Sequence, residues 1–184
     1  MDNGESSYRR FLDGDDYGME ELVRDYKDGL LLYINSYLKD LSIAEDCVQD
    51  TFIKLATKKP RFKGKCSFKT WLYSIGRNMA LYYIRKHRCR SFESIDECEN
   101  ISAENDLERD YLIEEQRILL HRMLCRLKEE YRQVLYLVYF ENFSNSEVGK
   151  IMGKSSKQTE NLIYNARKTL RSELEKEGFD YEKL

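Results

Sequence analysis

The 184-residue sequence contains one proline, two histidines and no long apolar run. Its longest wholly apolar stretch, residues 134–140, has seven residues, whereas a membrane-spanning helix needs roughly 20. The opening MDNGESSYRR carries acidic side chains and no apolar core, which is not the pattern of a secretory signal. We therefore expect a cytoplasmic protein that does not insert into a membrane.

The sequence also lacks the residue patterns of metal sites and of enzymes. Its five cysteines are an odd number without a Cys-x-x-Cys pair, and no zinc-ligand spacing is present. A metal cluster of His87, Cys89 and Cys98 is the alternative, and ordinary reduced thiols are favoured over it. No nucleophile–base set, metal–carboxylate cluster or phosphate loop supports catalysis. We therefore expect no metal, no cofactor and no enzymatic activity of its own.

Charge is unevenly distributed along the chain, although the net charge is only −2. Residues 58–90 hold eleven Lys or Arg and no carboxylate, and residues 93–115 hold ten Asp or Glu and one basic residue, Arg109. Residues 143–172 hold six Lys or Arg against Glu147 and Glu160. Solvated helix faces explain mixed charge well but explain poorly a long stretch without any carboxylate. Two separated basic zones predict contact with a polyanion at two places.

Apolar residues recur at helical spacing almost throughout, which predicts an all-α protein. We expect two small helical domains, at 8–90 and 108–175, joined by an acidic linker at 91–107 and followed by a tail at 176–184. Three Ser-x-x-Glu or Ser-x-x-Gln capping boxes, beginning at Ser42, Ser144 and Ser155, predict helix starts. The predicted helices are 17–39, one from Ser42, 68–88, 112–127, 129–141, one from Ser144 and one from Ser155.

The last two predicted helices have the spacing of a helix-turn-helix. A short helix after Ser144 ends at Gly153, which can adopt the left-handed conformation, and a longer capped helix follows. Helical hairpins of unrelated proteins can have the same spacing. Four residues predict the buried stripe of the long helix: Thr159, Ile163, Ala166 and Leu170. Its outward Asn, Gln and Glu side chains suit base edges in the DNA major groove.

The basic block at 58–90 combines a lysine-rich loop with a helix dense in aromatic residues. Cations with interleaved aromatics suit unpaired DNA, because every base has a face that can stack. The competing interpretation, that these side chains are core residues, is favoured for four of them: Phe68, Trp71, Leu72 and Ile75. That interpretation does not account for the cations and the asparagine of the block.

Two stretches of this sequence resemble a known family. IAEDCVQDTFIKL followed by RFKGKCSFKTWLYSIGRNMALYYIRKHR resembles region two of the sigma-70 family, extracytoplasmic-function group. LKEEYRQVLYLVYFENFSNSEVGKIMGKSSKQTENLIYNARKTLRSEL resembles region four of the same group. The resemblance implies a dissociable, non-catalytic subunit of bacterial RNA polymerase that recognises promoters at duplex −35 and melted −10 elements. Its implied partners are core RNA polymerase, promoter DNA and an anti-sigma factor.

The resemblance also implies roles for particular residues. Region two would bind the polymerase clamp through Asp46, Gln49, Asp50 and Phe52. The loop at 62–68 would capture a base flipped from the −10 element. The −10 contacts would be Phe62, Lys63, Lys65, Ser67, Phe68, Asn78, Tyr82, Arg85, Lys86 and Arg88. The −35 contacts would be Ser155, Ser156, Lys157, Gln158, Glu160, Asn161, Tyr164, Asn165 and Lys168. The linker would occupy the RNA channel of the polymerase.

Five positions depart from the usual pattern of the family. Lys154 stands where an apolar residue is common and Thr159 where Val or Ile is common, which predicts a slightly looser helix-turn-helix core. Glu160, Leu162 and Asn165 stand where basic residues are frequent, which predicts an unusual −35 sequence. The alternatives are a free helix-turn-helix repressor or activator, and a helical adaptor or nucleic-acid enzyme.

Overall fold

The computed structural model describes residues 3–87, 124 and 126–176. Helices account for most of this part of the chain, and it contains no strand, so the prediction of an all-α protein is confirmed. The helices are α1 (Asn3–Leu12), α2 (Tyr17–Leu38), α3 (Leu41–Lys58), α4 (Phe68–His87), α6 (Glu129–Tyr139), α7 (Asn145–Met152) and α8 (Ser156–Lys176). The predicted linker and most of the predicted helix at 112–127 lie outside the described residues.

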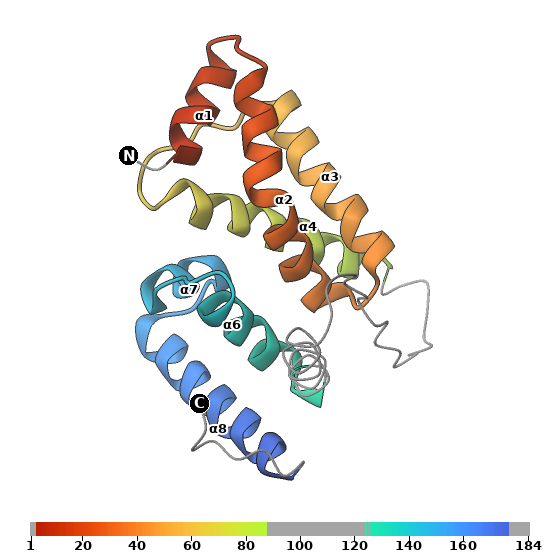
Figure 1. The fold of residues 1–184 in the computed structure, drawn as a ribbon, viewed down its shortest axis with the longest axis vertical. Coiled ribbons are helices and arrows are strands. Elements are labelled where there is room, and N and C mark those ends of the chain that lie inside the picture. The colour runs from red at the N-terminus through yellow and green to blue at the C-terminus, as the bar shows by residue number, and fades with distance from the viewer. Residues whose placement is uncertain (1–2, 88–123, 125, 177–184) are drawn as a thin grey trace, which may run out of the picture.

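Helices α1 to α4 form one half of the molecule, with α2 at its centre between α1, α3 and α4 (Figure 1). Helix α1 is not among the helices expected from the sequence. It packs against α2 at Gly18, where a Cβ atom would collide with the backbone of Ser7 and Phe11. Tyr8 and Phe11 of α1 are buried in the core of this half.

Helix α3 begins one residue before Ser42, the position that the sequence predicted as its cap. Asp40 is the N-cap, and its side chain accepts a hydrogen bond from the backbone N–H of Ile43 at 3.0 Å. The residue before it, Lys39, adopts the left-handed conformation that ends α2. The prediction of a cap at Ser42 is therefore wrong, because an aspartate two residues upstream supplies a good N-cap acceptor first.

Helices α6, α7 and α8 form the other half. The capping box of Ser144 and Glu147 is complete, and Gly153 ends α7 with φ of 66°. Ser155 and Gln158 also exchange both bonds of a capping box, at 2.9 and 3.3 Å. The helix-turn-helix geometry predicted from these residues is thus present in the structure.

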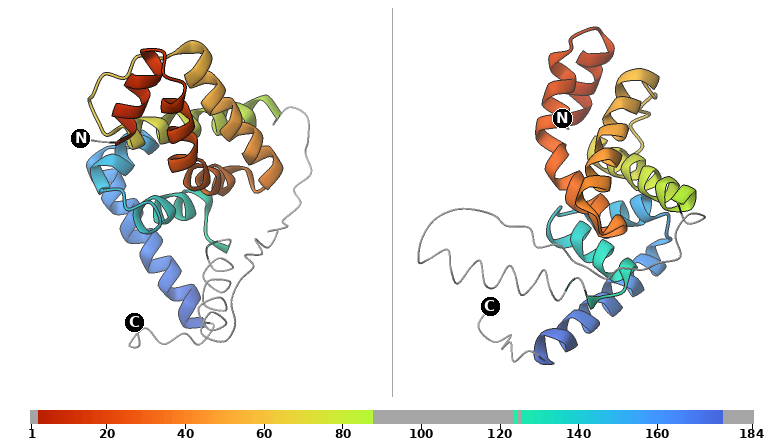
Figure 2. Two further views of the ribbon diagram at one scale, coloured as in Figure 1. Left: turned by 45° about the horizontal axis from the view of Figure 1, so that its top comes forward. Right: turned by 90° about the vertical axis from the view of Figure 1, so that its right-hand side faces the viewer.

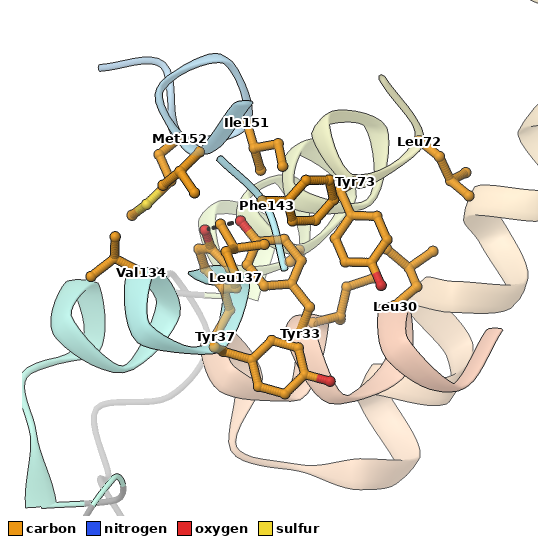
Figure 3. Close-up of a cluster of buried hydrophobic side chains, with 14 of the residues drawn as sticks. Leu30, Tyr33, Tyr37, Leu72, Tyr73, Val134, Leu137, Phe143, Ile151 and Met152 are labelled. Carbon is orange, nitrogen blue, oxygen red and sulfur yellow. Dashed lines mark hydrogen bonds between the residues drawn. The ribbon is translucent and has the colours of Figure 1, made fainter. Parts of the chain in front are cut away.

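The two halves pack against each other through a shared apolar core, in which α2 and α4 face α6 and α7 (Figures 1 and 2). The ring of Tyr73 from α4 meets Phe143 edge-to-face at a centroid distance of 5.0 Å, within the cluster drawn in Figure 3. The ring of Tyr33 lies 6.4 Å from that of Tyr136. Aromatic pairs of this kind stabilise packing beyond their buried area.

Polar contacts add to this interface between the halves. Lys69 forms a 2.8 Å ion pair with Glu141, and its ammonium lies over the ring of Phe143. The guanidinium of Arg132, which is buried, donates to the backbone carbonyl of Ser36 at 2.9 and 3.2 Å. The halves therefore form one packed unit in this conformation.

Candidate nucleic-acid and polymerase interfaces

The nine residues predicted to contact −35 DNA all lie at the start or on the outer face of α8, and all are exposed. Tyr164 is 67% exposed. Thr159, Ile163 and Ala166 are buried on the opposite side, as the predicted stripe requires, and Leu170 is half-buried. The helix therefore presents a polar face to solvent while its apolar face packs against α6 and α7.

Three departures from the family pattern have structural explanations. Leu162 is buried, 9% exposed, so it is a core residue in this structure. The hydroxyl of Thr159 donates to the Ser155 carbonyl at 2.9 Å, which satisfies its polar group inside the core. Lys154 is half-buried, and its ammonium pairs with Glu130 at 2.9 Å. None of the three leaves a polar group without a partner in the helix-turn-helix.

A second polar face runs along α4. Asn78, Tyr82, Arg85 and Lys86 are exposed and follow each other at helical spacing, so they share one side of the helix. Lys63 and Lys65 are exposed in the loop before α4. The loop and this side of α4 both expose cations, and α4 adds an exposed aromatic side chain, which is the composition of a single-strand binding face.

Other residues assigned to the −10 contact are less accessible. Phe68 is fully buried, with its ring against Tyr8, Phe62 and Trp71. It therefore supports the loop from beneath in this conformation and offers no ring face to a base. Ser67 is half-buried and hydrogen-bonded to Glu147. Arg88 lies outside the described residues.

Glu147 connects the loop before α4 with the helix-turn-helix. Besides capping α7, its carboxylate accepts hydrogen bonds from the hydroxyls of Ser67 and Thr70, each at 3.0 Å. Burial alone would raise the pKa of Glu147, but the hydrogen bonds from Ser144, Ser67 and Thr70 outweigh it and hold the pKa below its ordinary value. The ammonium of Lys150 also donates to the backbone carbonyl of Lys65 at 3.3 Å.

A third face, on α3, is acidic. Asp46, Gln49 and Asp50 are exposed on one side of the helix, and the apolar Ile53 beside them is 55% exposed. Phe52, which was grouped with them, is only 8% exposed and faces the core. The difference arises because positions 49 and 50 lie outside the core-facing stripe, whereas 52 lies in it.

Two residues next to the loop at 62–68 are not among the site residues expected from the sequence. Glu5 from α1 and Arg61 line a surface recess together with Phe62, Lys63 and Gly64. No local pattern could have found this recess, because its walls come from segments more than fifty residues apart. Within the described part of the chain, no group of three His, Cys, Asp or Glu could hold a metal ion. None of the helices described there is long and apolar enough to cross a membrane.

Comparison with known proteins places these faces in a family context. Residues 22–90 match the model of sigma-70 region 2, and residues 117–170 match that of sigma-70 region 4. The RNA polymerase sigma factor YlaC of Bacillus subtilis is 29% identical over 160 residues, which cover 86% of this chain and 92% of YlaC. The ECF RNA polymerase sigma factor SigW of the same organism is 26% identical over 170 residues, covering 88% and 91%.

Solved structures show the same fold. The structure of CnrH in complex with the cytosolic domain of CnrY has a TM-score of 0.68 at 22% identity, covering 95% of this chain and 98% of that one. The sigma factor RpoE of Bartonella quintana, in complex with the anti-sigma factor NepR, has a TM-score of 0.66 at 22% identity, covering 85% and 96%. Two family models in the expected order and relatives aligned over most of their length lead to one conclusion. The chain belongs to the sigma-70 family of RNA polymerase sigma factors, in its extracytoplasmic-function group.

Proposed function

We propose that this protein is a dissociable sigma subunit that binds core RNA polymerase in the cytoplasm and directs it to specific promoters. One observation carries the proposal. Two exposed faces have the composition of nucleic-acid-binding surfaces. One lies on α8, and the other lies on α4 and the loop before it. They are in different halves of a sigma-type fold. The chemistry of RNA synthesis belongs to the polymerase in this proposal, and the sigma subunit selects the site.

The outer face of α8 reads the −35 element as duplex DNA. Its Asn and Gln side chains pair with base edges, Glu160 accepts from a cytosine amino group, and Lys157 and Lys168 contact phosphates. The exposed side chains of this face support the assignment, since each must reach the groove. The modest positive charge indicates that much of the affinity comes from other contacts.

The loop at 62–68 and the exposed side of α4 bind the melted −10 element. Lys63, Lys65, Arg85 and Lys86 hold the backbone, and Asn78 and Tyr82 face the bases. Phe68 supports the loop without touching DNA in this proposal. Extruding one base costs a few kcal/mol of stacking, which contacts in the loop must offset.

The acidic side of α3 binds the polymerase. Asp46 and Asp50 give it negative charge, and Ile53 adds an exposed apolar contact between them and the end of the helix. Protein interfaces typically have an apolar core and a polar rim. On this face Ile53 corresponds to the core, and the charged residues around it correspond to the rim. An anti-sigma factor is a further proposed partner, in line with the NepR complex of the structurally similar RpoE.

Promoter binding requires the two halves to separate. The −35 and −10 elements are named for their positions on the DNA, which differ by about 25 base pairs. At about 3.4 Å per base pair, these about 25 base pairs place the two elements roughly 85 Å apart along the duplex. A compact chain of this length has a radius of gyration of about 16 Å. The packed arrangement described above therefore cannot contact both elements at once, and the interface through Lys69, Arg132 and Glu147 must open.

The test is run-off transcription with purified core polymerase on a library of promoter fragments. Wild-type protein should yield specific start sites that core alone does not, and a gel shift without polymerase should show no tight duplex binding. Asp50→Ala should reduce association with core by roughly 1–2 kcal/mol, a typical loss for a contact residue, without changing which promoters are chosen. A failure to select any promoter with active core would reject the proposal, and tight dimeric binding to a palindrome would favour a free repressor or activator.

A further inference from the structure

The N-terminal turn of α1 is held tightly against the loop at 62–68. A Cβ atom at Gly4 would lie 2.5 Å from both the ring of Phe68 and the hydroxyl of Tyr26, so the helix can approach this closely only with glycine there. Tyr8, one turn later, donates its hydroxyl to the backbone carbonyl of Pro60 at 2.8 Å. Burial raises the pKa of Tyr8 to about 12, so this hydroxyl stays protonated and remains a donor.

Glu5 lies between these two anchor points and faces the recess beside the loop. The recess has a volume of about 500 Å³ and is lined by Glu5, Arg61, Phe62, Lys63 and Gly64. This volume lies within the range of small-molecule sites, roughly 300–1,000 Å³. At Gly64 the loop is open, since nothing lies within 4 Å of the position of a Cβ atom.

The recess combines the groups that an unpaired nucleotide needs. Phe62 is half-buried, and its ring is fixed by Phe68 and Trp71 at centroid distances of 5.7 and 5.3 Å. An aromatic ring held in this way offers a stacking surface. Arg61 and Lys63, the residues before and after Phe62 in the sequence, are exposed and also line the recess, so they can contact phosphates of the strand that carries an extruded base.

Glu5 is the one carboxylate among the described residues that line the recess. Among the residues that the structure describes, its ion-pair partner is Arg9 within α1 at 2.9 Å, and the side chains of Glu5 and Arg9 are 41% and 67% exposed. Exposed pairs of this kind contribute little and are easily exchanged. A carboxylate at neutral pH only accepts hydrogen bonds, which limits the bases that it can pair with.

In the proposed function this recess is the site of the unpaired −10 base, and we propose that Glu5 selects a base with an exocyclic amino group there. This inference rests on the proposed function and deepens it. Cytosine, adenine and guanine each present amino hydrogens to the carboxylate, whereas thymine presents two carbonyl oxygens on either side of its single N–H. A thymine carbonyl oxygen would therefore face the Glu5 carboxylate. Because both groups only accept hydrogen bonds, thymine is disfavoured at this position.

The experiment measures transcription by holoenzyme from a promoter library in which every −10 position is randomised. Wild-type protein should disfavour thymine at one position by a factor between about 5 and about 150, the range for one mismatched base pair. Glu5→Gln should relax that position alone, because an amide both donates and accepts. Glu20→Gln, an exposed residue of α2, is the charge-matched control and should leave all preferences unchanged.

A second readout uses the same holoenzyme and short single strands of oligo-dC and oligo-dT, with binding followed by fluorescence anisotropy. Tighter binding of oligo-dC should be lost in Glu5→Gln and kept in Glu20→Gln. Unchanged base preference of Glu5→Gln in both assays overturns the inference while leaving the sigma function intact. If wild-type holoenzyme initiates at no promoter, the proposed function itself fails.

Discussion

Asn161 lies in the middle of the exposed side of α8, with Lys157 one turn before it and Tyr164 and Lys168 after it. These residues are spaced so that they share one face of the helix. The amide of Asn161 can pair with both the N6 and N7 edges of adenine, whereas the flanking lysines can only contact phosphate as point charges. We expect sequence choice to depend on Asn161 and general affinity to depend on the lysines.

Asn161→Ala should lower activity on the preferred −35 sequence by about 1–3 kcal/mol and relax selection at one base pair. Lys168→Ala is the matched control, and it should weaken binding about equally on all sequences while reducing its salt dependence. Competition transcription on −35 variants at two salt concentrations measures both effects. If promoter choice is unchanged in Asn161→Ala, this assignment is wrong.

Glu147 is a single residue with two structural tasks, because it caps α7 and also accepts from Ser67 and Thr70 of the other half. Its pKa is held below the ordinary value of 4.5. A lowered pKa means that the stabilisation is fully present above the ordinary value and is lost as the pH falls through the folded-state pKa. Acidification should therefore loosen this contact before the fold as a whole is lost.

Glu147→Gln should reduce the fall in melting temperature between pH 6 and pH 3.5, since glutamine does not titrate. The remaining pH dependence should include Glu21, whose pKa is also lowered by hydrogen bonds from Ser7 and Arg10. Glu147→Ala should cost roughly 1–3 kcal/mol at neutral pH, because the Ser144 N–H and the part-buried hydroxyls of Ser67 and Thr70 lose this charged acceptor. Thermal unfolding of the three proteins by circular dichroism measures these differences, and identical pH profiles for wild type and Glu147→Gln would contradict the argument.

At the scale of elements, α1 is the helix that the periodicity of the sequence did not predict. Its buried positions are Gly4, Ser7, Tyr8 and Phe11, and the first two carry no hydrophobic signal. The helix is nevertheless buried on that face, because small residues allow its backbone to approach α2 and Phe68 closely. Short helices of this kind depend on packing more than on propensity, so periodicity in the sequence does not reveal them.

Gly18→Ala should displace α1 from α2, because the added Cβ atom would collide with the backbone of Ser7 and Phe11. Overpacking typically costs 1–3 kcal/mol. We expect faster hydrogen exchange in α1 and weaker promoter melting, since α1 supports the loop at 62–68. The −35 preference should not change, because α8 lies in the other half. Gly14→Ala is the comparison for a collision, since nothing lies within 4 Å of its Cβ position. Its cost should come from the positive φ of 101° alone, without displacing α1 from α2.

At the scale of the whole molecule, the halves are joined by a shared apolar core and by polar contacts between them. Lys69 contributes an ion pair with Glu141, a hydrogen bond to its backbone carbonyl at 3.0 Å and a cation–π contact with Phe143. Tyr33, Tyr73 and Tyr136 belong to the apolar core that the halves share. An interface of this kind can open if a partner such as polymerase binds the open form better.

Lys69→Ala should shift the molecule towards the open arrangement, because it removes three contacts across the interface at once. Small-angle X-ray scattering should then give a radius of gyration above the roughly 16 Å of a compact chain of this length. Arg24→Ala, which removes only an exposed pair with the neighbouring Asp25, should leave the scattering unchanged. A scattering curve identical to that of the wild type would show that Lys69 does not hold the halves together.

The sequence by itself determined the helical fold, two of the three predicted helix caps and the polar face of α8. These features depend on neighbours within about one helical turn, so local spacing is enough to predict them. Residues 134–140, whose composition also suits a strand, lie in and just after α6 as expected. Their burial ends before Tyr139 and Phe140, which are exposed.

Only the tertiary structure decided which aromatic residues face solvent and which elements meet. Phe52 and Phe68 were assigned to binding faces, but both are buried, because their exposure depends on helices distant in sequence. The recess brings Glu5 to Arg61 and Phe62, and the contact of Ser67 with Glu147 spans 80 residues. Contacts over such separations are fixed by how the whole chain packs, which local spacing does not encode.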